Sequence, residues 1–432
     1  MDTDADPGLP SRSTTGASRG GAPAPSHPDT DSSGAGAPHP SPGTALGEAA
    51  VALTVELVAI DSVNPGLVPG AAGEAAVSEH LRNRLRHNGF ETHVITPPGH
   101  DDRPSLLAVG PQRRPGPTVV LTGHLDTVGV DGMPHPFDPV VDRDRLTGRG
   151  SSDMKAGTAA MVVAAEELAA RGVPGRVVLA LVADEEDASL GAEAVLAALP
   201  GLGIHPDVAV VGEPTWLAAA ASLRGYALIE VTFTGRAAHS SQPEQGVNAV
   251  THLGRLLALL EQRHDVLATH GASLMVTVAS GGDSPFVLAR SARALVERRT
   301  VPGEPSDVAL AEVEQLLETL RAADPAVDAT ARLLVARDAW RLDAGGPAAE
   351  LTRELEAQLA ATAPDGAVPQ RLDAPYWMEA PLWQAAGIPA LVCGPAGGGL
   401  HAADEWVDLD QVRRYAEALV EAVATWAENR AH

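Results

Sequence analysis

The sequence predicts an α/β fold, in which a mostly parallel sheet is flanked by helices and a smaller α+β domain is inserted into the chain. Two observations support it. Short apolar runs alternate with helical patterns in the first half of the chain and again near its end, which is typical of a parallel sheet covered by helices. The middle of the chain has a different order of elements, with strands that alternate between apolar and polar residues.

The elements of the larger domain follow a tail that we expect to be disordered. Residues 1–45 are mostly Pro, Gly, Ser and Ala, so they cannot bury enough apolar surface to offset the entropy of ordering. Residues 46–60 and 73–90 then place apolar side chains at helical spacing, and the second pattern stops at Gly89. Buried strands are predicted at 105–110, 118–126, 176–186 and 207–215, with a helix at 154–172.

The inserted domain is predicted over residues 224–338. Its elements read β-α-β-β-α-β, which is the order of a ferredoxin-like open sheet. The α/β pattern resumes afterwards with a helix near 350–362 and a buried strand at 387–394, so residues 46–223 and 339–432 are expected to form one discontinuous domain. The predicted elements of the insert cover 226–235, 246–262, 272–280, 293–301, 306–323 and 329–336.

Composition excludes several classes of function. The chain has 31 basic and 56 acidic residues, and its net charge of −25 would repel nucleic acid and anionic membrane surfaces. Cys393 is the only cysteine, so no internal disulfide can form. The sequence has no run of about eighteen apolar residues and no secretory signal, so we expect a cytoplasmic protein.

Residues that can bind metals or transfer protons follow several predicted strands. In an open α/β sheet the carboxyl ends of the strands line one crevice, so these side chains can meet although they are far apart in the sequence. Two imidazoles with several carboxylates suit zinc, manganese or cobalt better than calcium. The residues are His124, Asp126, Asp153, Glu185, Glu186, Glu213 and His401.

Each of these residues also has an ordinary structural interpretation. A single histidine at a strand end is more often a hydrogen-bonded structural residue than a ligand, and a Glu-Glu pair is usually solvated. Here five separate strand-end positions carry ligand-type residues in apolar surroundings. Unpaired charges in such a place are costly, and a bound cation removes that cost, so we favour a metal site.

Seven motifs follow one another along the chain: TGHLDTV, GRGSSDMKAG, ADEED, GEPT, GRAAHSSQPEQGVNAV, VERRTVPGE and GPAGGGLHAADEWV. In this order they resemble the motifs of the di-zinc deacylases and peptidases that include acetylornithine deacetylase, succinyl-diaminopimelate desuccinylase and glutamate carboxypeptidase. The resemblance extends from Leu46 to the C-terminus. It implies a catalytic domain with two metals and an inserted lid domain, 224–338, through which two chains form a homodimer.

The resemblance also implies a role for each matching residue. His124 and Glu213 would hold one metal, Glu186 and His401 the other, and Asp153 would bridge them. The metals would be zinc, with cobalt or manganese as alternatives.

The remaining matches concern catalysis and substrate binding. Asp126 would orient His124 by accepting its second ring N–H, and Glu185 would be the general base. His239 would reach the neighbouring subunit's active site and donate to the oxyanion, Arg299 would bind a substrate carboxylate, and Asn248 would support the substrate. Arg298, one residue earlier, should face the other side of its strand.

We therefore expect a metal-dependent hydrolase that cleaves the amide bond of an N-acyl amino acid. A carboxypeptidase or dipeptidase on the same site, and a non-catalytic protein that binds acyl amino acids, are the alternatives. A nucleotide-binding Gly-rich loop at 394–399 is disfavoured, because no helix opens after it at the required glycine spacing. Met378 and Glu379 stand where relatives often have Thr-Asp, a difference that affects specificity more than catalysis.

Overall fold

The computed structural model describes residues 44–305, 307–364, 366–367 and 369–431. Its largest sheet has six strands. The strand order is β1-β2-β6-β3-β7-β15. Strands β6, β3, β7 and β15 are parallel to one another, whereas β2 pairs antiparallel with both β6 and β1. The expectation of a mostly parallel sheet is confirmed. The strands are β1 (Glu91–Ile95), β2 (Ser105–Val109), β3 (Thr118–His124), β6 (Arg176–Val182), β7 (Val208–Val211) and β15 (Ala390–Val392).

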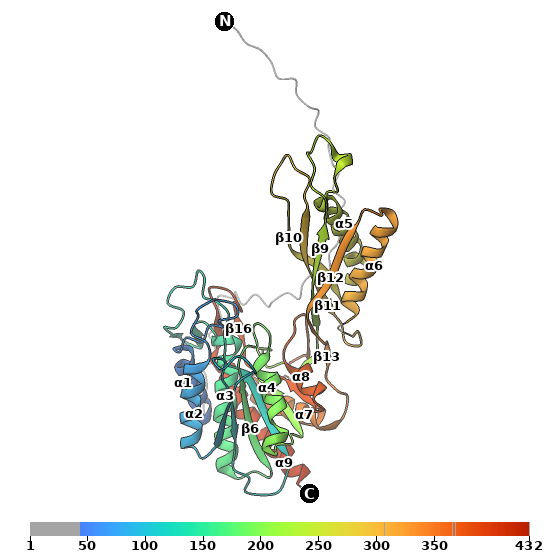
Figure 1. Ribbon diagram of the computed structural model, residues 1–432. Helices are drawn as coiled ribbons and strands as arrows, with labels where there is room; N and C mark the ends of the chain where they lie inside the picture. The colour runs from blue at the N-terminus through green and yellow to red at the C-terminus, as the bar shows by residue number, and fades with distance from the viewer. Residues whose placement is uncertain (1–43, 306, 365, 368, 432) are drawn as a thin grey trace, which may run out of the picture. The chain divides into compact units, whose positions relative to one another are not determined.

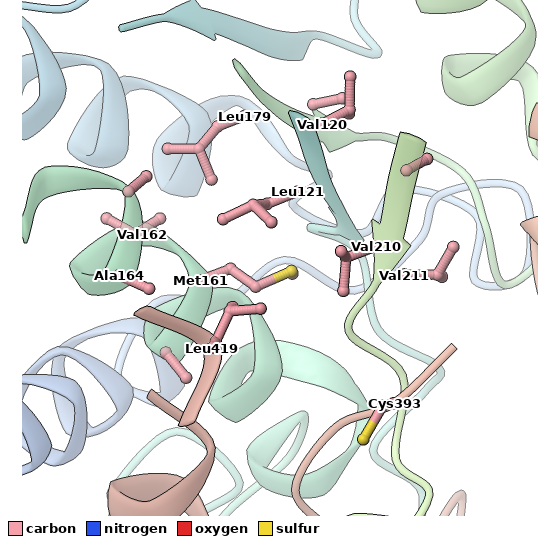
Figure 2. Close-up of a cluster of buried hydrophobic side chains, with 14 of the residues drawn as sticks. Val120, Leu121, Met161, Val162, Ala164, Leu179, Val210, Val211, Cys393 and Leu419 are labelled. Carbon is pink, nitrogen blue, oxygen red and sulfur yellow. The ribbon is translucent and has the colours of Figure 1, made fainter. Parts of the chain in front are cut away.

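Helices pack against this sheet and against one another. Helix α3 contacts β3 and β6, and it also contacts α1 and α9. Figure 2 shows the resulting core, where Leu121, Leu179 and Val210 of the strands meet Met161 of α3 and Leu419 of α9. The helices of this part are α1 (Ala45–Val58), α2 (Ala75–His87), α3 (Ala156–Arg171), α4 (Leu190–Ala198), α7 (Gly346–Thr362), α8 (Ala380–Ala385) and α9 (Leu409–Arg430).

The inserted segment forms a separate antiparallel sheet with the order β10-β11-β9-β12 (Figure 1). Alternate residues of β9 are buried and contact helices α5 and α6, because a strand points successive side chains to opposite faces. The β-α-β-β-α-β order is confirmed. The elements are β9 (Gly225–Thr234), α5 (Ala249–Ala268), β10 (Ser273–Gly281), β11 (Ser291–Thr300), α6 (Val308–Ala323) and β12 (Asp328–Arg337).

Two small sheets complete the described part of the chain, with the orders β13-β8-β14 and β16-β17-β5-β4. Their strands are too short for an apolar pattern, so periodicity does not indicate them. Strand β8 directly precedes β9, and β13 directly follows β12. The chain therefore enters and leaves the inserted segment through the β13-β8-β14 sheet. The strands are β4 (Val140–Asp142), β5 (Arg145–Thr147), β8 (Ala220–Leu223), β13 (Trp340–Arg341), β14 (Leu372–Ala374), β16 (Gly397–Gly398) and β17 (Trp406–Asp408).

The division into a lid over 224–338 and a domain over 46–223 and 339–432 agrees with these sheets and remains our proposal. The prediction for residues 1–45 falls almost entirely outside the described residues, and helix α1 begins at Ala45. Among the described helices, none has both the length and the hydropathy needed to cross a membrane.

Helix α3 approaches β7 so closely that Gly157 has no room for a side chain. A Cβ built there would lie 2.0 Å from the main-chain oxygen of Gly212. We expect Gly157→Ala to lower the free energy of unfolding by about 1–3 kcal/mol, measured by urea denaturation, because the helix must move away from the strand. Gly254→Ala in α5 is the control, because the space around Gly254 is open and alanine favours the helix. Equal stability of the two variants would contradict the packing argument.

Candidate metal centre

Two clusters of metal-ligand residues share Asp153. One contains His124, Asp153 and Glu213, the other Asp153, Glu186 and His401, and within each cluster the ligand atoms lie within 4.8 Å of one another. His124 ends β3, Glu186 and Glu213 follow β6 and β7, and Asp153 lies in the turn before α3. The parallel strands therefore deliver these side chains to one edge of the sheet.

The two carboxylate oxygens of Asp153 face different clusters. Oδ1 lies 3.0 Å from Nε2 of His124, whereas Oδ2 lies 3.3 Å from Nε2 of His401. Nε2 of His401 is also 3.1 Å from a carboxylate oxygen of Glu186, and Nε2 of His124 is 3.9 Å from one of Glu213. A carboxylate that divides its oxygens in this way could bridge two cations.

The electrostatics of the site fit two divalent cations. Burial and the charge of Glu213 raise the pKa of Glu185, and burial raises the pKa of Glu213, with Asp153 adding to it. One carboxylate oxygen of Glu186 is buried without a hydrogen-bond partner. Cations would offset this crowding of buried negative charge, and the nitrogen and oxygen ligands suit zinc, cobalt or manganese.

The Asp126 carboxylate makes contacts that differ from the sequence-based expectation. Nδ1 of His124 lies 3.0 Å from the main-chain oxygen of Asp126 and 3.7 Å from its carboxylate. The carboxylate instead accepts hydrogen bonds from the main-chain nitrogens of Glu185 (3.1 Å) and Glu186 (3.2 Å) and from the Asn64 side chain (2.7 Å). The carbonyl is therefore the nearer partner of His124, and the carboxylate holds the loop that carries the candidate base.

Sequence reasoning missed Glu405, which is buried beside the Asp153 turn. Its carboxylate accepts hydrogen bonds from three main-chain nitrogens of residues 150–153, at 2.9, 2.9 and 3.0 Å, and pairs with Nη1 of buried Arg149 at 2.6 Å. Its position four residues after His401 was the only signal in the sequence. These contacts orient the main chain around Asp153, as the outer partners of metal ligands commonly do.

A pocket of about 400 Å³ opens onto both clusters and is also lined by Glu185, Arg299 and Met378. Arg299 donates to Glu297 at 2.5 Å. Arg298 lies on the opposite face of β11, fully buried and paired with acidic side chains, which confirms that the two arginines face different sides.

Three other residues singled out in the sequence do not line this pocket. His239 is exposed, with Nδ1 2.8 Å from the Ser241 hydroxyl, and its role across a dimer interface remains a prediction. The Asn248 side chain accepts from the main-chain nitrogen of Val250 and caps α5. Glu379 is buried, and burial together with the charge of Asp126 raises its pKa to about 8.

We expect cation binding to release protons at pH 7. Hydrogen bonds to Asp153 and Glu186 raise the pKa of His401 to about 10. Burial alone would lower the pKa of His124, but Glu213 and Asp153 hold it well above its usual value. Both rings therefore carry protons that a cation must displace, so the apparent affinity should fall as the pH is lowered. Zinc titration calorimetry in two buffers of different ionisation enthalpy measures the release.

The control for this titration is His401→Ala, which should release fewer protons per zinc bound. A binding enthalpy that does not change with the buffer would contradict the protonation states inferred from these contacts.

Comparison with known proteins identifies the family to which this chain belongs. The model of peptidase family M20/M25/M40 matches residues 120–425, more than half of the chain. An acetylornithine deacetylase from Myxococcus xanthus is 30% identical over 88% of this chain and 98% of its own length. An N-acetyl-L-citrulline deacetylase from Xanthomonas campestris pv. campestris is 31% identical over 84% of this chain and 94% of its own.

Solved structures agree with the fold. A tripeptidase from Staphylococcus aureus has a TM-score of 0.73 at 17% identity, over 88% of this chain and 99% of its own. At that identity the similarity concerns the fold alone. Together with the family match, these comparisons lead to one conclusion: the chain belongs to peptidase family M20/M25/M40 and is a metallohydrolase that acts on C–N bonds.

Proposed function

We propose that the protein hydrolyses the amide bond of N-acyl amino acids with two divalent metal ions, with zinc as the default and cobalt or manganese as alternatives. His124 and Glu213 would hold one ion, Glu186 and His401 the other, and Asp153 both. The observation that carries the proposal is the shared position of Asp153 between the two clusters, at a pocket that Glu185 also lines.

Glu185 is the proposed general base. When bound, the cations would lower the pKa of a water molecule and polarise the substrate carbonyl. Glu185 takes the proton of that water and later gives it to the nitrogen of the broken amide bond. Burial and the charge of Glu213 raise the pKa of Glu185, which brings it nearer to the operating pH of a proton-transfer catalyst.

Arg299 and the relatives support the proposed substrate class. Arg299 lines the pocket, and a guanidinium can bind a carboxylate beside the scissile amide. Two relatives that cover most of the chain are named deacetylases, which supports a deacylase more than a carboxypeptidase or dipeptidase. Assays of N-acetyl and N-succinyl amino acids and of dipeptides, with zinc, cobalt or manganese, test this choice.

The lid supports a proposal of dimerisation. Strand β10 lies at the edge of the lid sheet, and its apolar side chains Met275 and Val278 are 46% and 50% exposed. An apolar sheet edge of this kind is a site for pairing with another chain. We propose that two lids associate and that His239 then reaches the partner's pocket.

The first prediction of this proposal separates catalysis from metal binding. Glu185→Ala should keep both metals and lower kcat at least about 10²-fold, because only the proton acceptor is lost. Glu186→Ala should lose one metal per chain. Metal analysis and steady-state kinetics on the same preparations measure both effects.

Glu261→Ala, at an exposed position of α5, is the control and should resemble the wild type. A strong chelator should abolish hydrolysis by the wild type, and added cation should restore it. Full activity in metal-free protein would refute the proposal, and loss of metal from Glu185→Ala would mean that the roles of Glu185 and Glu186 are reversed.

A mixed dimer tests the role of His239 across the interface. One subunit carries His239→Ala and the other Glu185→Ala. If His239 acts on the neighbouring subunit, both changes fall in one active site and the other stays intact, so about half of the wild-type activity should remain. A nearly inactive hybrid would show that His239 acts within its own chain, and the two homodimeric variants are the controls.

A further inference from the structure

Two hydrogen-bond donors in the lining of the candidate pocket have no partner among the described residues. Tyr376 and Trp377 line the pocket together with Glu185 and Asp153. The hydroxyl oxygen of Tyr376 and the indole nitrogen of Trp377 are both buried, and the described residues offer neither of them a partner. Leaving a buried polar group unpaired destabilises the folded protein. A donor held in this state inside a pocket is available to a bound molecule.

The surrounding contacts involve the main chain of Tyr376 and the ring of Trp377. They lie in the loop between β14 and α8. The main-chain oxygen of Tyr376 accepts a hydrogen bond from the nitrogen of Arg224 at 3.2 Å. The Trp377 ring packs edge to face against the ring of Tyr226, with centroids 5.9 Å apart. Trp377 therefore contacts β9 of the lid sheet.

Tyr376 offers an unpaired hydroxyl in the pocket that Glu185 also lines. Burial raises the pKa of its phenol, and the charges of Asp153 and Glu213 raise it further, so the hydroxyl keeps its proton throughout the neutral range. The candidate metal ligands Asp153, Glu186, Glu213 and His401 line the same pocket as Tyr376. A neutral donor in that position can approach developing negative charge without first losing a partner.

We propose that Tyr376 is a catalytic residue whose hydroxyl donates a hydrogen bond to the substrate carbonyl oxygen as that oxygen becomes negatively charged. The proposal rests on the proposed hydrolase function. The water oxygen bonds to the carbonyl carbon, the π pair moves onto the carbonyl oxygen, and Glu185 takes the proton. The C–N bond then breaks, the carbonyl re-forms, and the nitrogen receives that proton. Tyr376 keeps its own proton throughout.

Other donors in the same chain are less suited to this role. His239 is exposed, hydrogen-bonded to Ser241 and absent from the pocket lining, so a single chain does not bring it to the carbonyl. Arg299 lines the pocket but pairs with Glu297, and its charge suits a substrate carboxylate. Tyr376 would therefore supply a donor from the same chain as Glu185.

The test is Tyr376→Phe, which removes the hydroxyl and keeps the ring. We expect kcat to fall about 10²-fold or more, as for removal of one oxyanion donor, while KM, zinc content and melting temperature stay near those of the wild type. The assay uses the best substrate among the N-acetyl and N-succinyl amino acids and dipeptides. Affinity for a phosphinate analogue of that substrate, whose phosphorus oxygens replace the oxyanion, should fall by a similar factor.

Tyr415→Phe is the matched control. The hydroxyl of Tyr415 is also buried and unpaired, but Tyr415 as a whole is fully buried and lies in the core on α9. The same loss of an oxygen there should leave kcat and analogue affinity unchanged, so it separates a catalytic effect from the general effect of removing a buried hydroxyl.

Each other outcome overturns the proposal in a recognisable way. A higher KM with unchanged kcat would mean that the hydroxyl binds only the substrate ground state. A parallel loss of zinc and activity would mean that Tyr376 acts on the metal site. A fully active Tyr376→Phe beside an active wild type refutes this inference alone. A wild-type protein that hydrolyses no amide in the panel refutes the proposed function and the inference with it.

Discussion

Buried negative charge at the carboxyl ends of β3, β6 and β7 is the constraint on which the rest of the structure depends. Asp153, Glu185, Glu186 and Glu213 lie around two histidines at one pocket. Burial raises the pKa of the three glutamates, and repulsion by neighbouring carboxylates raises it further. Such a group of acids needs cations or protons to be stable. The surrounding chain must also keep each carboxylate in its orientation when those charges change.

Buried acids that are not candidate ligands provide this orientation. Asp126 accepts the main-chain N–H groups of the loop after β6, and Glu405 accepts those of the Asp153 turn. Arg149 neutralises Glu405, as Arg103 neutralises buried Glu74 behind the same loops. Hydrogen bonds to the backbone fix the loops more directly than side-chain contacts could, so the ligands are preorganised. The frame around the site is therefore polar and fully buried.

The fold class and most of the candidate metal centre can be predicted from the order of the residues alone. Apolar runs separated by helical patterns are enough to specify a parallel sheet. Because parallel strands bring their carboxyl ends together, the same pattern assigns His124 and Glu213 to one site. The period of a strand likewise separates Arg298 from Arg299. These features depend on local periodicity and topology, which neighbouring residues encode.

Which atoms meet within the site depends instead on how distant segments pack. The family resemblance implies that the Asp126 carboxylate orients the His124 imidazole. In the structure that carboxylate instead accepts hydrogen bonds from the loop after β6, and the Asp126 carbonyl oxygen is nearer to the ring. Glu405 reaches the main chain of Asp153 across 252 residues of sequence, and the unpaired hydroxyl of Tyr376 is evident only in the folded pocket. The residue type determines which hydrogen bonds a side chain can make. The partners it finds are set by contacts between segments that are far apart in the chain, which no local pattern records.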